Sequence, residues 1–131
     1  MEFNLSVGLE GAAQELVTQE NTAKKYGSGD IEVYATPAMI GLMENASLKA
    51  VDPLLPEGFA TVGMHVDIKH LASTPIGMNV EAKAVLQGID NKKLTFSVQA
   101  FDERELIGEG THVRYIIQQD KFLNRTKEKS K

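Results

Sequence analysis

Residues 36–53 read TPAMIGLMENASLKAVDP, and the fold prediction starts from this stretch. It predicts one long helix from Pro37 to about Val51. Thr36 can cap this helix with its side chain, and Pro37 suits the first helical position. Asp52-Pro53 ends it, because the residue before a proline is disfavoured in helical geometry. Apolar side chains occur on nearly every side, so we expect the helix to be largely buried.

The rest of the chain reads mainly as strands. A first strand is expected over Leu9–Thr18, followed by a single capped helical turn over Asn21–Tyr26. Four later segments alternate apolar and polar residues and are expected to be strands: Ala60–His70, Met78–Leu86, Leu94–Ala100 and Leu106–Gln118. Short connections favour antiparallel pairing, and the apolar face of the sheet must be covered. The sequence therefore predicts an α+β fold, an antiparallel sheet wrapped around one long central helix.

Composition sets the broad class. A chain of 131 residues is the size of one domain, which we place at residues 1–123, followed by a polar, basic tail at residues 124–131. The net charge of −4 argues against nucleic-acid binding, and no apolar run approaches the ~18 residues that span a membrane. The start of the chain lacks the features of a signal peptide, and zero cysteines exclude disulfides and fit a reducing cytoplasm.

Glu44 lies in the middle of the predicted helix. A buried carboxylate is costly unless it is paired, and burial suits such a group to acid–base chemistry. Two interpretations stay open: Glu44 is such a group, or the helix has a wet side on which it lies with Asn45 and Lys49. The apolar neighbours Ile40 and Val51 favour the first.

His70 is the most informative histidine. Strand alternation places it on the apolar side with Val62 and Met64, whereas His65 lies on the polar side. A histidine that ends an apolar strand face points to the region that the helix covers. The alternative is a core histidine bonded to a backbone carbonyl.

Thr36 and Gly63 each have a structural and a functional interpretation. A hydroxyl at a helix N-terminus is a cap, and it can also help to hold a polar ligand or an acidic group. A glycine inside a strand marks a bulge or a close approach by ligand or backbone. At position 63, a free backbone N–H would stabilise a developing oxyanion, and a bulge that bends the sheet round the helix is equally open.

Other chemical signals are absent from the sequence. There is no phosphate-binding loop and no nucleophile-elbow motif, and the three histidines lack the spacing of metal ligands. His112, beside Arg114, is typical of a surface or dimer contact. An open sheet edge and a partly uncovered helix favour a homodimer.

Together these segments resemble the hotdog-fold acyl-CoA thioesterases, and within them the fluoroacetyl-CoA thioesterase-like group. The most specific motif is ATPAMIGLMENA at residues 35–46. Supporting motifs occur at four further places: Gly27–Asp30, Thr61–Gly63, His70–Gly77 and Gly108–Arg114. The resemblance covers roughly Val7 to Leu123.

The resemblance implies hydrolysis of an acyl-CoA to a free acid and CoA, with no metal or redox cofactor. It implies a catalytic set of Thr36, Glu44 and His70, with the Gly63 N–H offered to the thioester carbonyl. Glu44 would be the general base or the nucleophile, and His70 would assist proton transfer to or from the leaving thiolate. Thr36 would position Glu44 or the water. The family builds two sites per homodimer at the subunit interface, with helix and strand residues from different chains, and a tetramer is also possible.

One departure from the family concerns the substrate. In the enzyme that gives the group its name, phenylalanines before the helix form a lid linked to fluoroacetyl selectivity. Residues 26–34 of this chain contain no phenylalanine, which favours a broader acyl-CoA thioesterase. Two alternatives remain because fold does not settle function: an acyl-CoA hydratase or dehydratase, and a non-catalytic acyl-CoA-binding dimer.

Overall fold

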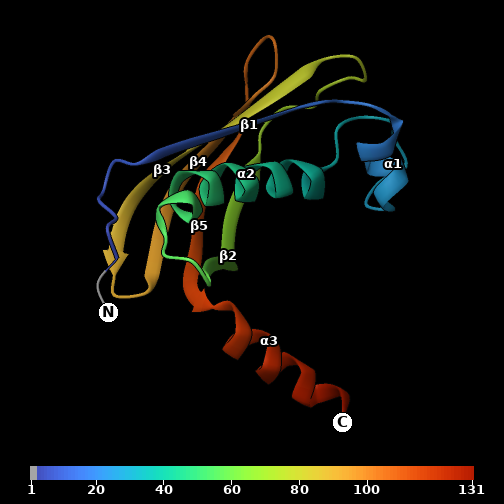
Figure 1. Cartoon of the computed structure of the whole chain (residues 1–131). Helices are drawn as coiled ribbons and strands as arrows, with labels where there is room; N and C mark the ends of the chain where they lie inside the picture. The colour runs from blue at the N-terminus through green and yellow to red at the C-terminus, as the bar shows by residue number, and fades with distance from the viewer. Residues whose placement is uncertain (1–2) are drawn as a thin grey trace.

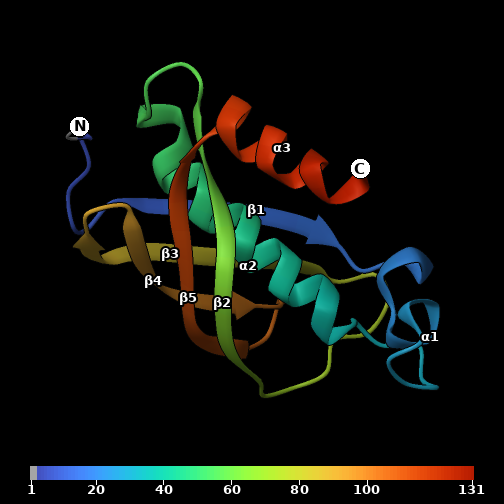
Figure 2. The ribbon, with the colours of Figure 1, turned by 90° about the horizontal axis from the view of Figure 1, so that it is seen from below.

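Figure 1 shows the computed structural model of the protein, which describes residues 3–131. Five antiparallel strands form one sheet in the order β1-β3-β4-β5-β2, which leaves β1 and β2 at its edges. The main elements are β1 (Glu10–Leu16), α1 (Ala23–Tyr26), α2 (Thr36–Val51), β2 (Phe59–His70), β3 (Asn79–Asp90), β4 (Lys93–Phe101), β5 (Leu106–Gln118) and α3 (Gln119–Lys127). Figures 1 and 2 show the sheet curving around α2, as the sequence predicts.

Helix α2 packs its apolar side on β1, β3 and β4. Every second residue of β3 and β4 faces it and is buried: Val80, Ala82, Ala84, Leu86, Leu94, Phe96, Val98 and Ala100. A Cβ at Gly11 would overlap the carbonyl of Ala46, so glycine lets β1 lie directly on the helix backbone. Eight of the 16 helix residues are buried, whereas Ile40 and Leu48 are only half-buried. The helix is therefore less enclosed than its composition predicts.

The prediction that Thr36 caps α2 is wrong. The N-cap is Ala35, whose backbone is extended and whose N–H donates to the Asn21 carbonyl at 2.9 Å. That bond holds Ala35 in the preceding loop, so Thr36 is already the first helical residue. No side chain caps the N-terminus of α2, and the Thr36 hydroxyl contacts His70 instead.

Strand β2 contains a bulge at Met64, between the paired positions Gly63 and His65. Before the bulge, Thr61 and Gly63 pair with the inward-facing residues of β5, and after it the inward positions are Val66, Ile68 and His70. The extra residue reverses the alternation. The prediction that Val62 and Met64 share the face of His70 is therefore wrong, and Met64 is 61% exposed.

The C-terminal segment continues as a helix. The expected solvated tail at residues 124–131 lies in α3 and the short helical turn after it, and it is exposed throughout. Figure 1 shows α3 extending from the end of β5 beyond the sheet. Among residues 3–131, no helix combines the length and apolarity needed to cross a membrane.

Candidate active site

Several inward-facing polar side chains lie where α2 faces the β2–β5 pair, among them His70, His112 and Arg114. At one end, the Thr36 hydroxyl lies 2.7 Å from His70 Nδ1. Thr36 is the first residue of α2 and His70 is the last of β2, so the helix start and the strand end fix this contact. The predicted inward position of His70 is confirmed.

His70 carries an unused nitrogen. Burial lowers its pKa, partly offset by the nearby backbone of Ala72, so the imidazole is neutral at pH 7. Among residues 3–131, Nε2 is the buried side-chain nitrogen without a hydrogen-bond partner. Buried polar groups in native proteins are nearly always satisfied, and an exception calls for an explanation. Nε2 can bind a further group whichever tautomer Thr36 selects.

Glu44 and Gly63 form a second pair further along the same interface. Glu44 follows Thr36 by eight residues, about 12 Å along the helix axis. A Cβ added at Gly63 would lie 2.8 Å from Glu44 Oε2, so the carboxylate rests directly against this glycine. Glu44 is half-buried and faces β2, whereas Lys49 is exposed. Glu44 therefore belongs to the space between helix and sheet rather than to the Lys49 surface.

A buried polar network surrounds the second pair. Arg114 donates from Nε to Thr61 Oγ1 at 2.8 Å and from Nη2 to the Thr61 carbonyl at 2.9 Å. Its Nη1 lies 3.2 Å from His112 Nε2. The Thr61 hydroxyl in turn donates to Asp52 Oδ1 at 2.6 Å. Each member thus fixes the geometry of the next.

The prediction that His112, beside Arg114, forms a surface or dimer contact is wrong. They are 1% and 5% exposed and face α2, since their β2 partners Val66 and Gly63 face the same way. His112 Nδ1 lies 2.8 Å from the His65 carbonyl, which can only accept, so Nδ1 carries the proton and Nε2 accepts from Arg114.

Electrostatics ties this network to Glu44. Burial lowers the pKa of His112, and the positive charge of Arg114 lowers it further. The hydrogen bond to the His65 carbonyl and the negative charge of Glu44 both raise this pKa, but they only partly offset the burial. Burial also lowers the pKa of Arg114, opposed by Asp52 and then by Glu44. The guanidinium remains charged at neutral pH, so the Glu44 carboxylate lies in the field of a buried cation. The sequence contains one signal for the inward position of His112 and Arg114: they alternate along one strand with the apolar Ile116.

The structure thus brings Thr36 to His70 and Glu44 to Gly63. In the part of the chain that the structure describes, no hydrogen bond joins the two pairs. The resemblance implies that Thr36 positions Glu44 or the water. Within one chain, the Thr36 hydroxyl contacts His70 instead of Glu44. Across residues 3–131, no three His, Asp or Glu side chains gather closely enough to hold a metal ion.

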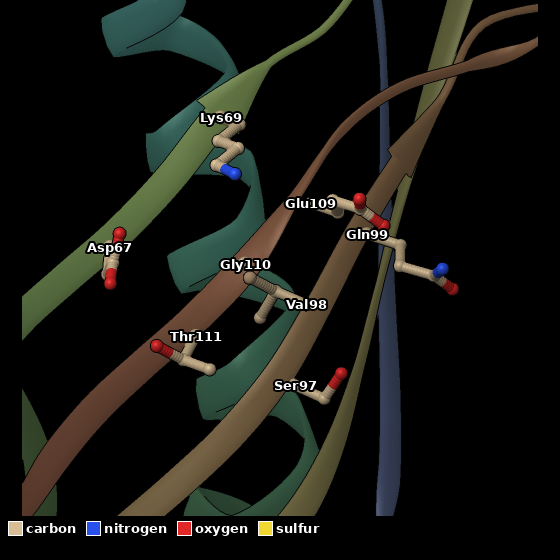
Figure 3. A pocket seen from close by; sticks show the side chains of 8 residues that line it. All are labelled: Asp67, Lys69, Ser97, Val98, Gln99, Glu109, Gly110 and Thr111. Atoms are coloured by element: carbon tan, nitrogen blue, oxygen red, sulfur yellow. The ribbon is translucent and has the colours of Figure 1, made fainter.

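A separate open cavity of about 340 Å³ lies on the outer face of the sheet, with α2 behind the strands (Figure 3). Polar side chains of β2, β4 and β5 line it, among them Asp67, Lys69 and Glu109. It contains none of the four predicted site residues and no buried unsatisfied group, so we do not assign the chemistry to it.

Comparison with known proteins places the whole arrangement in context. A family model described as fluoroacetyl-CoA-specific thioesterase matches residues 17–120. The fluoroacetyl-CoA thioesterase of Streptantibioticus cattleyicolor is 37% identical over 99 residues, which cover 76% of this chain and 71% of that relative. A solved structure of the fluoroacetyl-CoA thioesterase FlK superposes with a TM-score of 0.89 at 32% identity, over 96% of this chain and 98% of that one.

Two further structures are similar. A hypothetical protein of Thermus thermophilus, described as a thioesterase superfamily member, has a TM-score of 0.85 and 32% identity, with 95% of this chain and 94% of that chain covered. A hot-dog-like protein from Thermanaerovibrio acidaminovorans has a TM-score of 0.86 at 23% identity, over 95% and 93% of the two chains. At that identity the likeness concerns the fold alone.

Proposed function

Because this chain belongs to the fluoroacetyl-CoA-specific thioesterase family and has its hotdog fold, we propose that it hydrolyses an acyl-CoA to a carboxylic acid and CoA. The observation that carries the proposal is His70, a neutral imidazole with one nitrogen held by Thr36 and the other buried and unpartnered. Such a nitrogen is suited to a water, a thioester or a leaving thiolate.

The proposed reaction adds water to the thioester carbonyl and expels the thiolate. Glu44 takes a proton from the attacking water, or attacks the carbonyl itself to form a short-lived anhydride that water opens. The oxyanion is proposed to accept a hydrogen bond from the Gly63 N–H, which lies on the edge strand β2 directly before its bulge. The intermediate then collapses and expels the thiolate, while the neutral His70 accepts the proton that Glu44 took from the water and passes it to the thiolate, so both residues return to their starting forms. A thiol with a pKa near ~8.5 leaves readily, so this last step needs little assistance.

A two-fold dimer supports this chemistry. Strand β2 is an edge strand, and its Met64 and Val66 are 61% and 43% exposed. In an isologous interface the same surface of both chains is in contact, so each contact occurs twice, once in each direction. A dimer across β2 would set the Thr36–His70 pair of one chain against the Glu44–Gly63 pair of the other. Each chain then holds two half-sites and each dimer two complete sites, which a tetramer of such dimers would retain.

The acyl group is proposed to be less restricted than fluoroacetyl. The segment before α2 exposes Tyr26 and Ile31, at 51% and 67%, and has no phenylalanine between residues 26 and 34. The substrate is therefore proposed to be an acyl-CoA drawn from a wider range of acyl groups.

Steady-state CoA release from a panel of acyl-CoAs tests the proposal, with wild type and Glu44→Gln compared. We expect turnover by wild type and a loss of about 10²-fold or more in Glu44→Gln. Glu57→Gln is the matched control, since Glu57 is exposed in the loop after α2. Equal turnover by wild type and Glu44→Gln would remove Glu44 from the mechanism.

The same panel separates the alternatives. Water addition to an enoyl-CoA without CoA release would favour a hydratase. Saturable binding of acyl-CoA with no turnover of any substrate would favour a binding dimer.

A further inference from the structure

The segments that carry Thr36 and His70 are joined by a second contact, away from the proposed reacting groups. The Tyr34 N–H, two residues before Thr36, donates at 2.9 Å to the carbonyl of Thr74, four residues after His70. The adjoining residues continue this contact as an isolated antiparallel bridge. Because the Thr36 hydroxyl also lies 2.7 Å from His70 Nδ1, the two segments are held together at two points.

Thr74 fixes the segment after His70 to the turn between β4 and β5. Its side chain is fully buried, and its hydroxyl donates to Asp102 Oδ2 at 2.9 Å. The other oxygen, Oδ1, accepts from the N–H groups of Arg104 and Glu105 at 2.8 and 2.9 Å. Burial alone would raise the pKa of Asp102, but the hydrogen bonds that it accepts outweigh burial and lower that pKa. Thr74 therefore donates to a charged carboxylate, which strengthens the bond.

Tyr34 fixes the segment before α2 to the edge strand β1. Its side chain is 1% exposed, and its hydroxyl donates to Glu15 Oε2. Burial, together with this bond, raises the pKa of Tyr34, so the hydroxyl keeps its proton. Two loops bonded only to each other can move together. Here each loop also has its own side-chain bond to a different part of the sheet.

We propose that Thr74, through its bond to Asp102, is a positioning residue that holds the His70 imidazole against the Thr36 hydroxyl. The inference rests on the proposed function, because it concerns the proton transfers assigned to His70. Thr74 is buried and Asp102 uses its hydroxyl, so its effect on His70 passes through the main chain and through Tyr34. A displacement of about 1 Å in a reacting group can lower a rate by about 10²-fold, so a fixed loop matters for turnover.

Kinetics of Thr74 variants test the proposal. Thr74→Val removes the hydroxyl and keeps the branched shape, whereas Thr74→Ser keeps the hydroxyl. We expect Thr74→Val to lower kcat about tenfold and change KM less than about twofold, and Thr74→Ser to recover most of kcat. Thr111→Val is the matched control, because Thr111 is exposed on the outer face of β5, and it should leave both constants unchanged.

Asp102→Asn is a milder second variant, which keeps the test open if Thr74→Val does not fold. It retains an oxygen for the two N–H groups of the turn and replaces the charged acceptor of Thr74. We expect a smaller loss of kcat at unchanged KM. A rise in KM at constant kcat in these variants would overturn the proposal, because the residues would then act on binding. Thr74→Ser as slow as Thr74→Val would also overturn it, because the hydroxyl would not be what matters.

The ¹⁵N spectrum of the imidazoles separates failure of this inference from failure of the proposed function, since it needs no turnover. In wild type, the Thr36 contact should hold neutral His70 in one tautomer, and His70→Gln assigns its signals. In Thr74→Val we expect these signals to move toward the average of the two tautomers, while those of His112, bonded to a carbonyl, stay in place.

The spectra and the kinetics together give distinct outcomes. Altered His70 signals in a protein whose wild type cleaves no acyl-CoA would keep the positioning role and remove the proposed reaction. Unchanged His70 signals in Thr74→Val would overturn the positioning role, whatever the turnover. Equal changes at His70 and His112 would overturn it as well, because Thr74 would then support the fold in general.

Discussion

The two sides of helix α2 are built on different principles. Toward β1, β3 and β4, the helix meets small and apolar side chains, and Gly11 brings β1 against its backbone. Toward β2 and β5, it meets His70, the His112–Arg114 network and a glycine that makes room for Glu44. The first side supplies stability and the second holds polar groups in fixed positions. One helix can thus anchor the fold and carry a site, because the sheet curls round both of its faces.

The strongest test of this contrast is Gly11→Ala on the apolar side. The added methyl would overlap the Ala46 carbonyl and crowd Ala50, both in helix backbone that cannot move aside. We expect a loss of about 3 kcal/mol in the free energy of unfolding, the upper part of the range for overpacking. Urea denaturation measures it. An unchanged midpoint would show that β1 does not rest on α2 as described.

The same substitution at Gly63 should act on activity instead. The new methyl would meet the end of the Glu44 side chain at 2.8 Å, which can rotate away, and the His112 ring at 3.1 Å, which needs to shift only slightly. We expect a change of less than about 1 kcal/mol in stability but a loss of about 10²-fold in kcat/KM, since both the carboxylate and the oxyanion donor are disturbed. Thioesterase assays and urea denaturation on one preparation measure the two effects. Equal stability losses at positions 11 and 63 would erase the distinction between the two sides.

The buried network gives a smaller effect on stability. Arg114→Met leaves the Thr61 carbonyl and His112 Nε2 without their donor, which we expect to cost about 2 kcal/mol. Removing the acceptor as well, in Arg114→Met/His112→Leu, should cost less than the sum of the single changes, because fewer polar atoms are left unpaired. Urea denaturation of the three variants completes the cycle. Additive losses would mean that His112 and Arg114 act independently.

The same contrast explains how far the sequence could be interpreted. On the apolar side, alternation identified β3 and β4 and the faces they bury, because apolar residues there do point inward. On the polar side, the sequence interpretation placed His112, beside Arg114, in a surface or dimer contact, although both residues are buried and face the helix. The bulge at Met64 added one residue and reversed the pattern in β2.

Residue patterns singled out Thr36, Glu44, His70 and Gly63, and the resemblance to a family joined them into one set, but local rules misplaced the Thr36 hydroxyl. An N-cap is judged from neighbouring residues alone, and the partner of Thr36 is His70, 34 positions away. Polar contacts between distant segments depend on the completed fold, so alternation and capping rules do not contain them. The apolar side needs no such contacts, and for that reason it was predictable.

The smallest expected effect is a pH dependence of stability confined to the polar side. Burial lowers the pKa of both His70 and His112 from the ordinary value of 6.5. As pH falls below about 6.5, the unfolded chain binds protons that the folded chain still excludes. The stability that neutral histidines contribute is therefore complete above this pH and lost as pH falls toward the folded-state pKa.

We expect His112→Gln to flatten the decline in unfolding free energy between about pH 7.5 and pH 5.5. His65→Gln is the matched histidine substitution, because the side chain of His65 is exposed. Urea titrations across this pH range measure both slopes. If His112→Gln kept the full decline, proton uptake would have to lie elsewhere, since Arg114 holds its charge over this range and leaves His112 as the titrating member of their pair. A flattened slope would instead show that His112 causes the pH dependence of stability. The side of α2 that carries the candidate site would then also be the side that is destabilised when a buried histidine is protonated.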